Sequence, residues 1–232
     1  MKYRGTRAVD LIGLVHFATE GYYQTIQQYL EGLAYHGYHI FCEGIDGESE
    51  TESTDDTDPA LLLWFEMVEM MILAQQKLAE AWGLVIQTEH LRGSRYNDLI
   101  SGSWICVDLP AREAAQMLCD AMRDEPNFET ALRSSICFWR HDPDAAQRRL
   151  GEALLKGQQA PDTALPPEVQ RVGKIIIDAR NEYLLRMTLR TRKDRPLAYP
   201  WGAGHLPGIA RALEAEGQEC VSVEWIPAFK IP

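Results

Sequence analysis

AVDLIGLVH, residues 8–16, is the stretch that decides the fold this sequence predicts. It is a nearly continuous apolar run, which is typical of a strand buried on both faces of a parallel sheet. Apolar residues at helical spacing follow over residues 19–36, and a second strand is expected over residues 38–45. A strand, a helix and a strand joined in this way form a parallel crossover. The sequence therefore predicts an α/β fold.

The remaining segments extend this pattern. Further strands are expected over residues 83–87, 104–109, 197–201 and 219–226, and helices over residues 59–82, 205–216 and from 167 or 175 to 192. Residues 111–155 are expected to be helical, with breaks near Pro126 and His141-Asp142-Pro143. We therefore expect one α/β domain over residues 1–232, with a mostly parallel central sheet flanked by helices. A helical insertion over about residues 110–175 is expected to cover the C-terminal edge of the sheet.

Charge and cysteine usage narrow the classes of partner. The formal net charge of −11 argues against general binding to nucleic acid or anionic membranes, which requires a cationic surface. Seven of the acids lie between Asp46 and Asp58, in a run expected to be a solvated loop. The five scattered cysteines lack a C-x-x-C pair and indicate reduced thiols, and no apolar run is long enough for a membrane span. These features favour the cytoplasm.

Two short motifs place a histidine three residues after a glycine, at the ends of two predicted strands. They are Gly13-Leu14-Val15-His16 and Gly202-Ala203-Gly204-His205, and Glu43 ends the strand after the first motif. We expect His16 and Glu43 at the C-terminal edge of neighbouring strands, where open α/β sheets bind ligands. An imidazole there can act as a general base or a metal ligand, although a histidine satisfied by a carbonyl is the simpler alternative.

Arg180 and Asn181 begin a late helix whose start is expected to face the same sheet edge. An arginine in a cleft offers a planar fork for a carboxylate or an oxyanion. Two structural alternatives stay open: a salt bridge between Glu43 and Arg180, and an ordinary surface arginine paired with Asp178 or Glu182. The glycine-rich entry to the helix at His205 exposes N–H groups that suit an anion.

The order of these motifs resembles the TraB/GumN family. That family includes Tiki-type metalloproteases and is related to erythromycin-esterase-like and ChaN-like proteins, whose α/β architecture matches the expected fold. The resemblance implies a catalytic set of His16, Glu43, Arg180 and His205, and contacts to substrate from Tyr22, Asn181, Gly202 and Gly204. The chain departs from the family at Asp108, because Leu109 stands where an arginine is usual; Arg92 and Arg95 are alternative sources of that charge.

The resemblance implies a hydrolase that uses activated water to cleave a peptide or ester bond. His16, Glu43 and His205 could hold Zn²⁺, Mn²⁺ or Co²⁺, and the alternative is a metal-free site with His16 as base and Arg180 as the only cation. A different class of function is a non-catalytic ligand-binding or regulatory protein that binds haem or a peptide in the same cleft. The expected partner is a small-molecule or peptide substrate, and the apolar helix over residues 59–82 leaves a homodimer open.

Overall fold

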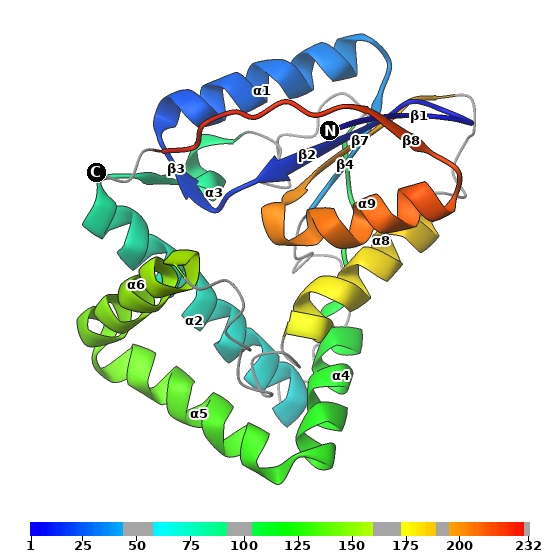
Figure 1. Ribbon diagram of the computed structural model, residues 1–232. Coiled ribbons are helices and arrows are strands. Elements are labelled where there is room, and N and C mark those ends of the chain that lie inside the picture. Colours follow the sequence, from blue (N-terminus) through cyan, green and yellow to red (C-terminus); the bar gives the residue numbers. More distant parts are fainter. Residues whose placement is uncertain (44–57, 92–103, 160–172, 189–194, 230–232) are drawn as a thin grey trace. The chain divides into compact units, whose positions relative to one another are not determined.

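The chain divides into two compact units. The computed structural model describes residues 1–43, 58–91, 104–159, 173–188 and 195–229 (Figure 1). Unit 1 contains Met1–Asp46, Leu84–Leu109 and Ile177–Pro232, and unit 2 contains Gly47–Gly83 and Pro110–Ile176. The residues predicted as a helical insertion thus belong to unit 2, together with the helix predicted over residues 59–82. That the insertion covers the edge of the sheet stays a prediction.

Unit 1 is built on a mixed sheet, which confirms the predicted α/β class. Its strand order is β6-β4-β7-β2-β1-β8. The strands are β1 (Lys2–Arg4), β2 (Val9–Leu14), β4 (His39–Cys42), β6 (Trp104–Cys106), β7 (Leu197–Gly202) and β8 (Glu219–Ser222). The pairs β2–β7, β7–β4 and β4–β6 are parallel, whereas β1 is antiparallel to both of its neighbours. Strand β1 was not expected from the sequence.

The expectation that His16 and Glu43 follow neighbouring strands is wrong, because β7 lies between β2 and β4. The β2-to-β4 crossover skips one position, and the late strand that carries the second glycine–histidine motif fills it. Gly13 pairs with Trp201 and Leu14 with Gly202, so the two motifs run side by side in parallel register. A Cβ on Gly13 would lie 2.7 Å from Leu206 Cδ2, which shows how closely the segment after β7 packs on β2.

Helices cover both faces of this sheet (Figure 1). On one face, α1 (Glu20–Tyr35) buries Tyr22, Tyr23, Ile26, Leu30 and Leu33 against β2, β4 and β7. On the other, α8 (Arg180–Thr188) and α9 (Leu206–Ala215) pack over Leu11, Phe41 and Tyr199. A turn of π-helix, Lys174–Ala179, leads directly into α8.

The strand expected over residues 83–87 is shorter and lies outside the main sheet. It forms β5 (Val85–Ile86), which pairs antiparallel with β3 (Phe17–Ala18) in a separate two-stranded sheet. The short helix α3 (Gln87–His90) follows. Because β3 begins directly after His16, this small sheet anchors the chain where it leaves β2.

Unit 2 is helical in its described part. It contains α2 (Pro59–Trp82), α4 (Ala111–Asp124), α5 (Pro126–His141) and α6 (Pro143–Gln159), and α2 contacts the other three. The predicted breaks at Pro126 and Pro143 are confirmed, because each proline begins a new helix where its missing N–H costs no hydrogen bond. Within the described ranges, no helix is both long and apolar enough to cross a membrane.

Replacing Gly13 by alanine tests the packing of the two motifs. The added methyl group meets Leu206, and overpacking of this kind typically costs about 1–3 kcal/mol. Gly32→Ala in α1 is the matched control: nothing lies within 4 Å of its Cβ position, so helix propensity should stabilise it by about 0.4–1 kcal/mol. Urea unfolding of both variants measures these changes, and equal stabilities would contradict the packing.

Candidate functional site

Four of the predicted residues, on four different segments, meet at the carboxyl ends of the parallel strands. Arg180 Nη2 lies 2.8 Å from Glu43 Oε1, and His205 Nε2 lies 3.5 Å from the same oxygen. His16 follows β2, and the charges of Glu43 and Arg180 change the pKa of its imidazole. All four belong to unit 1, so the site does not depend on how the two units are arranged.

The Arg180 guanidinium is buried and is held by two carboxylates. Nε donates to Asp108 Oδ1 at 2.7 Å and Nη2 donates to Asp108 Oδ2 at 2.5 Å, which is a bidentate pair. Burial alone would lower the pKa of Arg180, but Asp108 and Glu43 raise it, so the guanidinium stays charged. The Glu43–Arg180 salt bridge left open by the sequence is therefore present, whereas pairing with Asp178 or Glu182 is not what the structure shows.

Asp108 was the position at which the family resemblance weakened. Its side chain is only 2% exposed and receives the Arg180 fork even though Leu109 follows it. Burial raises the pKa of the Asp108 carboxyl, and the N–H donors of Arg180 act in the opposite direction. The arginine missing from the local sequence is thus supplied by a distant helix. Arg92 and Arg95 lie outside the described residues.

Glu43 is held as an anion. Burial raises the pKa of its carboxyl, but the contact with His205, the charge of Arg180 and the N–H of Gly202 outweigh burial and hold the pKa well below its usual range. Gly202 N donates to Oε2 at 2.6 Å, so both carboxylate oxygens have protein donors. Glu43 is therefore suited to stabilise positive charge beside it rather than to accept a proton.

A proline explains why Glu43 bonds to the backbone of Gly202. His39 N donates to Pro196 O, and in a parallel ladder of that phase the Phe41 carbonyl faces the nitrogen of residue 200. Residue 200 is a proline and has no N–H, so the β4–β7 ladder extends only to Ala198. Trp201 Nε1 donates to the Phe41 carbonyl instead, at 2.9 Å, and the next N–H on that side of β7, that of Gly202, reaches the Glu43 side chain.

His205 is buried against aromatic and polar partners. It is 3% exposed, and its ring lies edge-on to Trp201 at 5.0 Å between centroids. Its Nδ1 lies 2.8 Å from Asn181 Oδ1, and Asn181 Nδ2 donates to the His205 carbonyl at 3.3 Å. Asn181, predicted to contact substrate, is 4% exposed and contacts His205 with both ends of its amide. Trp201 was missed by the sequence analysis, and its place directly before Gly202 was the available signal.

His16 is the solvent-facing member of the cluster. Its side chain is exposed, and within the described part of the chain its imidazole makes no hydrogen bond. Partial burial lowers the pKa of His16, Glu43 raises it, and Arg180 and His205 lower it further, so the net shift is downward. The ring is therefore neutral at pH 7, as a general base requires.

Two tyrosines of α1 hold the strand end that carries His16. Tyr22 Oη donates to the Gly13 carbonyl at 3.0 Å, and Tyr23 Oη donates to the Val15 carbonyl at 2.8 Å. Tyr22 was predicted to contact substrate. It is 5% exposed, and its hydroxyl donates its hydrogen bond to a backbone carbonyl of β2. Of the predicted substrate contacts, Gly204 is exposed, whereas Gly202 is buried next to Glu43.

The predicted metal ligands do not form an open metal site as they are arranged. Glu43 Oε1 is bound to a permanent cation and Oε2 to a backbone N–H, so each oxygen already has one donor. Among the residues that the structure describes, no group of three or more His, Cys, Asp or Glu side chains is placed to hold a metal ion. Metal binding by His16, Glu43 and His205 stays a prediction.

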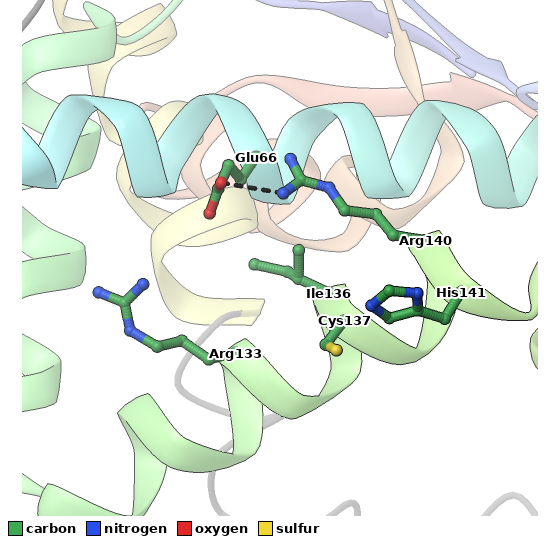
Figure 2. Close-up of a pocket in the computed structure, with 6 residues that line it drawn as sticks. All are labelled: Glu66, Arg133, Ile136, Cys137, Arg140 and His141. Atoms are coloured by element: carbon green, nitrogen blue, oxygen red, sulfur yellow. Dashed lines mark hydrogen bonds and ion pairs between the residues drawn. The ribbon is translucent and has the colours of Figure 1, made fainter.

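A separate pocket lies in unit 2, between α2 and α5 (Figure 2). It is lined by Glu66, Arg133, Ile136, Cys137, Arg140 and His141, none of which is a predicted site residue. Its cations already have acidic partners, since Arg140 pairs with Glu66 and Arg133 with Glu129. Cys137 and His141 share the pocket, but no contact joins them among the residues drawn in Figure 2.

We found no match to this chain among protein-family models, among curated proteins or among solved structures. The TraB/GumN resemblance therefore stays a prediction that rests on the order of the motifs.

Asp108→Asn should destabilise the protein strongly. It removes one of two counter-charges from a buried guanidinium, and breaking a buried pair costs about 3–5 kcal/mol; the remaining Glu43 places the expected loss at the lower end. Asp120→Asn is the control, because its pair with Arg123 is exposed at the surface and is worth at most about 1 kcal/mol. Denaturant unfolding compares the two, and similar losses would show that the buried pair is not a structural anchor.

Proposed function

We propose that this chain is a hydrolase of the TraB/GumN type that cleaves a peptide or ester bond with water activated by His16. One observation carries the proposal: an exposed imidazole with a lowered pKa lies beside a buried cluster of Glu43, Arg180 and Asp108 in which Glu43 is held as an anion. A surface histidine with a structural role alone does not need two carboxylates and an arginine ordered beneath it.

In the proposed reaction, His16 takes a proton from water as the oxygen attacks the substrate carbonyl carbon. The His16 ring becomes an imidazolium ion, which the Glu43 carboxylate stabilises through the interaction that raises the pKa of His16. The tetrahedral intermediate then collapses with cleavage of the C–N or C–O bond. The leaving amine or alkoxide takes the proton from His16, which restores the neutral ring.

The fork of Arg180 faces Asp108 and Glu43, so its main contribution is to keep Glu43 ionised. We assign the developing oxyanion to backbone N–H groups at Ala203 and Gly204, which are exposed at the entry to α9.

The proposal includes a metal-free site, in which the Arg180 cation rather than a metal ion balances the charge of Glu43. It also includes a cytoplasmic location, which the five free cysteines support. A haem-binding or peptide-binding role without catalysis is the competing class of function, and no contact in the described site specifically favours it.

His16→Ala should abolish hydrolysis while the fold survives. Loss of a general base typically lowers the rate about 10²- to 10⁴-fold, whereas an exposed side chain changes stability by at most about 0.5 kcal/mol. The measurement is a screen of peptide mixtures and nitrophenyl esters with wild type and variant, together with thermal melts. His36→Ala is the matched control, since His36 is exposed and belongs to no predicted site.

Two outcomes contradict this proposal. If His16→Ala retains cleavage, His16 is not the base; if neither protein cleaves any substrate but the wild type binds a peptide or haem, the binding function holds instead. Elemental analysis accompanies the assay. One equivalent of Zn²⁺, Mn²⁺ or Co²⁺ together with loss of activity in chelator would overturn the metal-free site.

The pH dependence should report His16. Its pKa lies below the ordinary value of 6.5, so the neutral base is lost only as the pH falls below that value. We expect kcat/KM to fall with decreasing pH with a midpoint below 6.5 and to become level at higher pH. Glu43 cannot produce this limb, because its pKa is well below the usual range. A midpoint above pH 7 would contradict the assignment.

A further inference from the structure

We infer that Asn181 is a positioning residue that holds His205 in the tautomer protonated on Nδ1, with Gly208 providing the space that this contact needs. The inference rests on the proposed function only for its catalytic consequence. The contact itself can be tested without any substrate.

The two hydrogen bonds of Asn181 determine the tautomer. Asn181 Nδ2 can only donate, and at 3.3 Å it meets the His205 carbonyl, which can only accept. The other end of the amide, Oδ1, therefore faces His205 Nδ1 at 2.8 Å and must accept a proton from it. The reversed amide would place an oxygen against the carbonyl. Both contacts thus agree on one arrangement, with the proton on Nδ1.

Gly208 independently supports this arrangement, because it leaves space for the Asn181 amide. It lies within α9, where glycine is the poorest helix former after proline. A Cβ on Gly208 would collide with Asn181 Nδ2. In contrast, nothing lies within 4 Å of a Cβ on Gly32 in α1. The glycine in α9 is therefore explained by the space that the Asn181 amide occupies.

The consequence lies at the opposite side of the ring. With Nδ1 bonded to Asn181, Nε2 of His205 faces Arg180 Nη1 at 3.5 Å. Nε2 is also 3.5 Å from Glu43 Oε1. Asn181 thus determines which edge of the His205 ring faces the Arg180–Glu43 pair.

The test measures the tautomer directly. The protein is labelled with ¹⁵N-histidine, and the His205 signals are assigned by their absence in His205→Gln; nitrogen shifts and N–H couplings at neutral pH then identify the protonated nitrogen. We expect Nδ1–H in the wild type and in Asn181→Asp, whose carboxylate still accepts. We expect Asn181→Leu and Gly208→Ala to lose this preference, and Gly32→Ala to keep it.

Two results would overturn the inference: a His205 ring without a proton on Nδ1 in the wild type, or unchanged protonation of Nδ1 in both Asn181→Leu and Gly208→Ala. If Asn181→Leu fails to fold, the His205 spectra of the wild type and of Gly208→Ala still test the inference. For any substrate that the wild type cleaves, kcat of Gly208→Ala should fall about 10- to 100-fold with KM unchanged. A raised KM at constant kcat in Asn181→Asp would instead support the direct substrate contact. A wild type that cleaves nothing contradicts the hydrolase and leaves the tautomer result intact.

Discussion

The buried guanidinium of Arg180 is the charge on which the rest of the site depends. A cation withdrawn from water is tolerated only with counter-charges and hydrogen bonds around it, and here two carboxylates provide them. Asp108 follows β6, Glu43 follows β4 and Arg180 begins α8, so one ion cluster joins two strand ends to a helix. The same cluster keeps Glu43 ionised, and this determines the electrostatics that His16 and His205 experience.

The geometry of β7 makes this cluster reachable. Pro200 interrupts the hydrogen-bond ladder with β4, and Trp201 Nε1 and Gly202 N satisfy the groups that would otherwise lack partners. The strand thereby ends with an N–H directed at a carboxylate rather than at another strand. The absence of a side chain at Gly202 also matters, since a Cβ there would lie 3.1 Å from Glu43 Oε2. The second glycine–histidine motif therefore brings the backbone of Gly202 close to the Glu43 carboxylate and buries the ring of His205.

The site separates two kinds of residue. Glu43, Asp108, Asn181 and His205 are buried or half-buried and hold one another in place, whereas His16 faces solvent. Proton transfer requires a group that can reach substrate and water, and the low pKa of His16 suits that group for base catalysis. The buried residues supply a fixed electrostatic field, and such a field stabilises charge most strongly where water is excluded.

Sequence alone determined the α/β class, the helices α1 and α2 and the proline breaks around α5, and it placed His16, Glu43 and His205 near the ends of strands. These follow from local signals: apolar periodicity, proline at helix starts and glycine before histidine. The sequence also left the Glu43–Arg180 pair open as an alternative, because a carboxylate that ends a buried strand needs a partner.

Only the tertiary structure decided how these residues are used. The position of β7 between β2 and β4, the pairing of Asp108 with Arg180, and the use of Asn181 and Tyr22 as internal partners all join residues far apart in the chain. Local periodicity carries no record of strand order or of which buried donor meets which acceptor. Those choices depend on satisfying every buried charge and N–H group at once, and that condition exists only when the whole sheet has formed.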